Sequence, residues 1–127
     1  MKTILIVGLG GGVGSILRYL CQKWIYAIYP HHFPWGTLAV NLAGCFLIGL
    51  LWGITFKTFD SNENWKLFLM VGLCGGFTTF SAFTLEGIGL LREHRLFLFI
   101  SYVAASVILG LILTYVGMKM IRADVNL

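Results

Sequence analysis

The sequence predicts an all-α membrane protein: four transmembrane helices forming a single domain over residues 1–127. Two observations lead to this prediction. Apolar residues make up 58% of the 127 residues and charged residues only 11%, and the mean hydropathy is +0.88. A soluble domain has about 25% charged residues, so this chain has too few to cover a water-exposed surface. The apolar residues also form four stretches, each long enough for the ~20 residues that cross a bilayer as a helix.

The four predicted helices follow one another with short connections. They cover residues Thr3–Ile28, Gly36–Phe56, Leu67–Leu91 and Leu96–Ile121. The connections contain polar residues or proline and are Tyr29–Pro34, Lys57–Lys66 and Arg92–Arg95. No connection is much longer than ten residues, so nothing remains from which to build a soluble domain. Any function must therefore lie inside the membrane.

Composition and charge exclude several functional classes. The net charge of +4 could attract nucleic acid, but the basic residues are scattered and mostly lie near the ends of apolar stretches, where Lys and Arg meet lipid head groups. The cysteines Cys21, Cys45 and Cys74 have no C-x-x-C spacing and fall in apolar context, which is typical of small core residues. No catalytic or metal-ligand constellation converges within the spans, so neither an enzyme nor a nucleic-acid partner is expected.

The basic residues are divided almost evenly between the two sides of the membrane. An excess on one side normally sets the orientation in which a chain inserts. One side carries five of them and the other carries four: Lys2, Lys57, Lys66, Lys119 and Arg122 against Arg18, Lys23, Arg92 and Arg95. We therefore expect dual topology, in which two oppositely inserted copies pair as an antiparallel homodimer. A single orientation fixed by other features is the alternative.

Glycine pairs predict close packing of the helices. The chain has 16 glycines, and small residues four positions apart let membrane helices approach closely. The pairs are Gly8 and Gly12, Gly10 and Gly14, Gly49 and Gly53, and Gly72 and Gly76.

The third stretch departs most from a plain membrane helix. Gly75, Gly76, Thr78 and Thr79 weaken it at mid-span. Backbone groups freed at that depth are tolerated only where protein, ions or water satisfy them, and unwound carbonyls are natural cation ligands. We therefore expect the third helix to be broken over Gly75–Thr78, with carbonyls that can bind a cation.

Polar residues within the spans are candidates for function, because they usually face a bundle interior, a partner or a pore. In the second stretch, Asn41 shares a face with Thr37 and Cys45 and forms either an interhelical hydrogen bond or part of a polar path. Arg18 either reaches the membrane interface or faces the bundle, where it would attract anions. The remaining candidates are a phenylalanine stripe every three residues, polar residues beside it, and two residues of the fourth stretch: Phe77, Phe80, Phe83, Thr79, Ser81, Thr84, Glu86, Tyr102 and Ser106.

The chain resembles the Fluc (CrcB) family of fluoride channels over nearly its whole length. The resemblance lies in GGGVGSILRY (10–19), GTLAVNLAGCFLIG (36–49), GLCGGFTTFSAFTLE (72–86) and SYVAASVILG (101–110). It implies a multi-pass protein of the bacterial inner (plasma) membrane that exports fluoride passively and so relieves fluoride toxicity. It also implies a dual-topology antiparallel homodimer with two pores and a central structural sodium ion.

The resemblance also implies roles for particular residues. Asn41 looks like the pore asparagine of the family, and Phe80 and Phe83 look like its two pore phenylalanines. Gly75 and Thr78 lie where the carbonyls that bind sodium are found. Further pore positions are matched by Tyr102 and Ser106 on the fourth helix and by Ser81, Thr84 and Glu86 on the polar side of the third.

Two positions depart from the usual pattern of the family. Residue 82 is Ala where the family generally has Thr, and residue 45 is Cys where it often has Ser. Ser81 and Thr84 would therefore have to supply any hydroxyl contact that the family makes at residue 82.

These residue types suit a small, strongly hydrated anion, which must exchange its water for hydrogen-bond donors at close range. Asn41 and the hydroxyls can donate, and phenylalanine rings can present their positive edges. A carboxylate repels an anion, so Glu86 is expected near a pore mouth or hydrogen-bonded to hydroxyls.

Two other functions fit the four-helix pattern. A small multidrug-type transporter is also a dual-topology protein, but its exchange mechanism needs a carboxylate in the first helix, and Thr3–Ile28 has no Asp or Glu. A non-transporting assembly subunit would use the polar residues only to join helices.

Overall fold

The computed structural model describes residues 1–30, 32–55, 63–124 and 126, and every regular element in these ranges is a helix. The elements are α1 (Lys2–Ile28), α2 (Trp35–Thr55), α3 (Asn64–Lys66), the π-helix η1 (Leu67–Cys74), α4 (Gly75–Phe77), α5 (Phe80–Arg92) and α6 (Leu96–Ile121). Phe56, where the second predicted helix ends, and Lys57 of the charge comparison lie outside the described residues.

Four segments are long and apolar enough to cross a membrane, which confirms the predicted helices. These segments are Lys2–Ile28, Trp35–Thr55, Asn64–Arg92 and Leu96–Ile121. Because α3, η1, α4 and α5 follow one another almost without interruption, they together make the third of these segments.

Local signals explain several helix ends. Pro34 precedes α2 and its carbonyl accepts the Leu38 N–H at 3.1 Å, a common way to begin a helix. The Thr79 hydroxyl caps α5 by accepting the Ala82 N–H at 3.2 Å. At the other end of α5 the chain turns through His94, whose positive φ of 56° reverses the backbone before α6.

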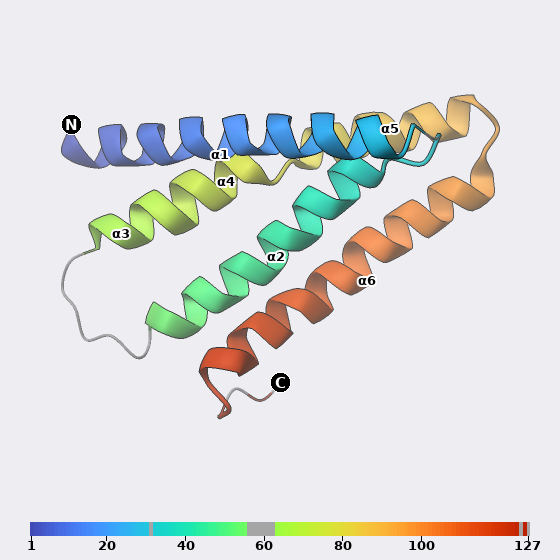
Figure 1. The fold of residues 1–127 in the computed structure, drawn as a ribbon. Coiled ribbons are helices and arrows are strands. Elements are labelled where there is room, and N and C mark those ends of the chain that lie inside the picture. Colours follow the sequence, from blue (N-terminus) through green and yellow to red (C-terminus); the bar gives the residue numbers. More distant parts are fainter. Residues whose placement is uncertain (31, 56–62, 125, 127) are drawn as a thin grey trace.

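The helices form two closely packed pairs (Figure 1). In one pair, α2 and α6 run side by side, and in the other α1 lies along η1 and α4. After α4 the chain continues into α5, which packs against α6. A core of Leu38, Leu90 and Tyr102 lies where α2, α5 and α6 meet. The third segment therefore contacts both pairs, its first half through α1 and its second half through α6.

Glycines make both pairs possible, because backbone lies directly against backbone. A Cβ on Gly14 would overlap the Leu73 carbonyl, and a Cβ on Gly49 would overlap the Thr114 carbonyl. The pairs Gly10 and Gly14, Gly49 and Gly53, and Gly72 and Gly76 thus pack as predicted. Gly8 and Gly12 do not, because a Cβ on either would meet nothing within 4 Å in the described part of the chain.

Gly14→Ala and Gly12→Ala should therefore have opposite effects. Gly14→Ala forces α1 away from η1, and such overpacking costs about 1–3 kcal/mol. Gly12→Ala meets open space and raises helix propensity, which is worth up to about 1 kcal/mol. Thermal unfolding in detergent measures both variants. Equal unfolding temperatures for the two variants would contradict this packing.

Candidate functional site

The third segment changes backbone conformation at Thr78 and Thr79. Helix α4 ends at Phe77, Thr78 (ψ 154°) and Thr79 (ψ 113°) are extended, and α5 begins at Phe80. The position differs from the expectation over Gly75–Thr78, since Gly75 is helical with φ −62° and ψ −39°. Gly76 is helical too and serves close packing, because its Cβ would overlap the Gly11 carbonyl.

This change in conformation also corrects the expected phenylalanine stripe. Phe77 belongs to α4 and lies before the extended residues, whereas Phe80 and Phe83 belong to α5. The spacing of three residues therefore places only Phe80 and Phe83 on one helix face. Their ring centroids are 5.6 Å apart.

Asn41 replaces the helix hydrogen bonds that Thr79 lacks. The Asn41 side-chain amide donates to the Thr79 carbonyl at 3.1 Å, and its oxygen accepts the Thr79 N–H at 2.8 Å. This two-way pairing fixes the orientation of the amide. The amide carries two donors, and its second N–H has no partner among the described residues, so it is available to a ligand.

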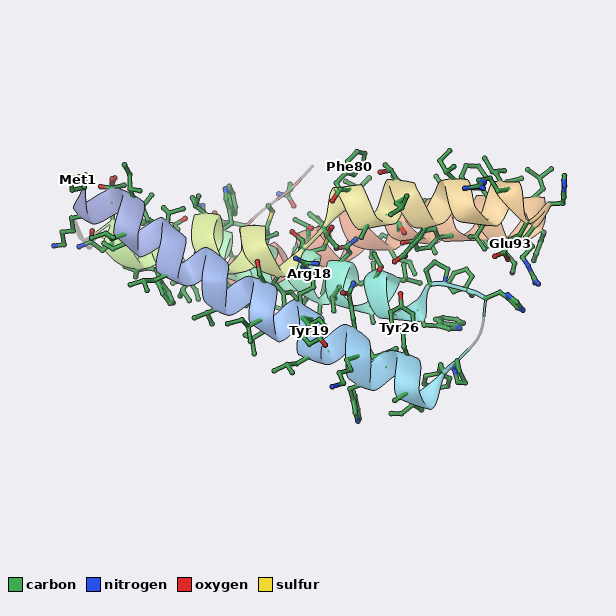
Figure 2. All side chains as sticks on the ribbon, turned by 90° about the horizontal axis from the view of Figure 1, so that it is seen from above. Met1, Arg18, Tyr19, Tyr26, Phe80 and Glu93 are labelled. Carbon is green, nitrogen blue, oxygen red and sulfur yellow. The ribbon has the colours of Figure 1, made fainter. Side chains whose placement is uncertain are left out.

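Arg18 lies at the junction between α4 and α5, which is formed by the extended residues Thr78 and Thr79 (Figure 2). Its Nε donates to the Gly76 carbonyl at 3.1 Å, and the Ser15 hydroxyl donates to the same carbonyl at 3.5 Å. Arg18 therefore connects α1 to the last turn before the extended residues, where its charge adds positive potential.

A cavity of about 440 Å³ lies against the extended residues Thr78 and Thr79 and is lined by six of the residues to which the family resemblance gives a role. These are Asn41, Gly75, Thr78, Phe80, Phe83 and Ser106. Phe80 is 77% exposed and points away from α1 (Figure 2), so part of the cavity wall is open to the surface of the single chain. The Ser106 hydroxyl oxygen is buried and has no hydrogen-bond partner among the described residues.

Glu86 lies apart from this cavity, in a cluster of hydroxyl groups. One of its oxygens accepts the Thr37 hydroxyl at 2.7 Å and the Tyr26 hydroxyl at 3.4 Å. The other accepts the Tyr102 hydroxyl at 3.1 Å. These contacts agree with the expectation that Glu86 is hydrogen-bonded to hydroxyls, and they spread its negative charge over three donors.

Tyr102 connects the two regions. Its ring packs on Phe83 with centroids 5.1 Å apart, while its hydroxyl binds Glu86. Glu86 also lines a second cavity of about 200 Å³, together with Tyr26 and His32. Phe83, Tyr102 and Glu86 thus form a continuous row between the two cavities.

Ser81 and Thr84 are not brought into either cavity. Both are exposed on α5, and the Thr84 hydroxyl donates to the Ser81 carbonyl at 3.0 Å. Within one chain, they therefore do not supply the hydroxyl that Ala82 lacks.

Two residues of the Glu86 cluster were not singled out from the sequence. Tyr26 binds Glu86 directly, and Gln22 donates to the Thr37 hydroxyl at 3.1 Å. Gln22 and Tyr26 are four residues apart within an apolar stretch, so they share a helix face. This spacing of two polar side chains within an apolar stretch is the sequence signal that could have identified them.

The backbone carbonyls of Gly75 and Thr78 are suited to bind a hard cation. Neither carbonyl receives a side-chain hydrogen bond among the described residues, whereas the Cys74 carbonyl accepts both the N–H and the hydroxyl of Thr78. Oxygen ligands are those that hard cations prefer.

Comparison with known proteins gives consistent matches over nearly the full chain. Residues 5–118 match the family of CrcB-like proteins (Camphor Resistance, CrcB). A protein of Phocaeicola vulgatus named fluoride-specific ion channel FluC is 45% identical over 120 residues, which are 94% of this chain and 98% of that protein. A protein of the same name from Flavobacterium psychrophilum is 46% identical over 93% of this chain and 95% of its own length. Another, from Rhizobium meliloti, is 42% identical over 98% of this chain and 100% of its own length.

Proposed function

Because this chain belongs to the CrcB family, we propose that it is a fluoride channel of the bacterial inner membrane, which lets fluoride leave the cell down its electrochemical gradient. One observation carries the proposal to particular residues. Around a single cavity, the chain gathers an oriented amide at Asn41, the rings of Phe80 and Phe83, and a hydroxyl at Ser106 that has no partner among the described residues.

Each of these groups can replace water around fluoride. Asn41 is held by Thr79 and offers its second N–H, and Ser106 offers a hydroxyl that no described residue accepts. Phe80 and Phe83 can present the positive edges of their rings. Selective pores exchange the hydration shell of an ion for such fixed groups.

The row beyond Phe83 supports an exit for the anion. Tyr102 contacts Phe83 and binds Glu86, which lines the second cavity. The three hydroxyl groups that donate to Glu86 partly offset its negative charge, so the carboxylate positions Tyr102 while repelling an anion less strongly.

A fluoride-sensitive bacterium that lacks its own fluoride exporter gives the cellular test. Expression of this chain should restore growth on fluoride, while growth without fluoride stays unchanged. A folded, membrane-inserted chain that gives no protection would count against the proposal.

We further propose that two copies pair in antiparallel orientation and form two pores. The exposed side chain of Phe80 and the open space beside Gly75, both at the cavity, support a partner that completes its wall. The nearly even division of Lys and Arg supports insertion in both orientations. Ser81 and Thr84, exposed on the same helix, would then face the partner or lipid.

A single cysteine added at the C-terminus, in a Cys21→Ser, Cys45→Ser and Cys74→Ser background, reports orientation. An impermeant maleimide should label about half of the molecules in intact cells. Several Lys added to one terminus should bias insertion and reduce function, and co-expression of two oppositely biased versions should restore it. Labelling of all molecules, or of none, would exclude dual topology.

The carbonyls of Gly75 and Thr78 lead us to propose a structural sodium ion between the two copies, where it would hold the junctions together. The chemistry of the ligands supports this ion, because all of them are backbone oxygens. Thr78→Ala should therefore leave the site intact, while a bulky residue at Gly75 should prevent pairing. Experimental density on the dimer axis should show an ion at about 2.3–2.5 Å from these oxygens, and water-like distances would contradict the assignment.

A further inference from the structure

Three sulfur-bearing side chains line the 440 Å³ cavity, and the permeation path described above uses none of them. They are Cys45 from α2 and both Met70 and Cys74 from η1. Met70 and Cys74 are four residues apart and so lie on the same face of their helix. Cys21, the third cysteine of the chain, is on α1 and does not line the cavity.

Close packing brings the two cysteine-bearing segments together. A Cβ on Gly44, the residue before Cys45, would overlap the Thr78 methyl group. Thr78 is in turn bound to Cys74, because its N–H and hydroxyl both donate to the Cys74 carbonyl at 3.0 and 2.9 Å. Both thiols are free of disulfides. Both residues therefore line the same cavity, with the Cys45 Sγ lying beside Gly110 of α6.

The chemistry of this set differs from that of the rest of the cavity. Thiolate and thioether ligands select soft metal ions such as Cu(I). Among the described residues, the cavity wall holds no carboxylate or imidazole, which would favour harder ions.

We propose that Cys45, Cys74 and Met70 form a binding site for a soft monovalent metal ion of the Cu⁺ or Ag⁺ type. Binding releases the proton of each ligating thiol to solvent and involves no change of oxidation state. An ion held there occupies the space bordered by Asn41, Phe83 and Ser106. Its occupancy should therefore stop anion passage, and this second effect rests on the proposed channel function.

Silver binding to the full chain in detergent tests the site without reference to transport. The experiment uses silver nitrate in chloride-free buffer and a Cys21→Ser background, which removes the thiol outside the cavity. We expect one Ag⁺ per chain after desalting, and protection of Cys45 and Cys74 from maleimide alkylation. Cys45→Ser should weaken Ag⁺ binding at least tenfold, and Met70→Leu, which retains size and both thiols, should weaken it measurably.

Unchanged Ag⁺ affinity in both Cys45→Ser and Met70→Leu would overturn the site. Fluoride efflux from proteoliposomes then tests the effect of occupancy, with Cys45→Ser as the resistant variant. Ag⁺ should slow efflux at least tenfold in the Cys21→Ser protein and leave Cys45→Ser unaffected. Efflux that persists with Ag⁺ bound would overturn the block. A protein that binds Ag⁺ as described but conducts no fluoride would instead contradict the proposed channel function and leave the metal site standing.

Discussion

Asn41→Asp should abolish fluoride efflux. The carboxylate can still accept the Thr79 N–H, but it can no longer donate to the Thr79 carbonyl, which the Asn41 amide contacts at 3.1 Å. It also removes the free N–H and places a negative charge at the wall of the cavity. We expect efflux to fall at least about 100-fold, which corresponds to about 2.7 kcal/mol in the barrier.

Fluoride efflux from proteoliposomes measures this effect, and size-exclusion chromatography in detergent checks assembly. Thr114→Val is a suitable control, because it also removes one side-chain donor to a backbone carbonyl, that of Cys45 at 3.1 Å, without touching the cavity. Its efflux should remain close to that of the unmodified protein. Normal efflux through a correctly assembled Asn41→Asp variant would exclude Asn41 from the anion path.

Phe83→Ile should also eliminate efflux while leaving the fold intact. Volume-conserving apolar substitutions usually cost less than ~1.5 kcal/mol, so the variant should assemble. It loses the positive ring edge in the cavity and the ring contact with Tyr102 at 5.1 Å. If the phenylalanines only fill the core, the variant should conduct normally.

Phe97→Ile provides the matched control for Phe83→Ile. Phe97 is on α6, is 81% exposed and lines neither cavity. It should therefore tolerate the same substitution with little change in efflux. Equal loss in Phe83→Ile and Phe97→Ile would indicate a general effect of the substitution and contradict a role for the Phe83 ring edge.

The four spans could be predicted because hydrophobic length and helix ends are local properties. The fourth predicted span, Leu96–Ile121, coincides with α6, and the first starts one residue after α1. In the sequence itself, Pro34 marks the start of α2, and the segment Arg92–Arg95 separates α5 from α6.

The position of the extended residues could not be predicted, because it depends on tertiary contacts. Glycine lowers helix propensity, yet Gly76 stays helical because close packing against Gly11 requires a residue without a side chain. Thr79 leaves the helix because Asn41, 38 residues away in the sequence, satisfies its backbone groups.

The candidate site was predictable only in part for the same reason. Asn41, Phe83 and Ser106 could be named as isolated polar or aromatic residues, and they line one cavity. The sequence did not show which face of α5 points into the protein: Thr84 is exposed, whereas Glu86 reaches Thr37. No spacing rule gives that face, because it follows from how α5 packs between α2 and α6.

Selective anion efflux from proteoliposomes shows whether the purified chain conducts fluoride. Vesicles that contain the purified chain and equal concentrations of potassium fluoride and potassium chloride are diluted into an impermeant salt, and valinomycin starts the flux by releasing potassium. Ion-selective electrodes record both anions from the same sample. Fluoride should leave rapidly, while chloride release stays at the level of protein-free vesicles. Equal release of both anions, or retention of fluoride by a correctly folded protein, would contradict a fluoride-selective channel.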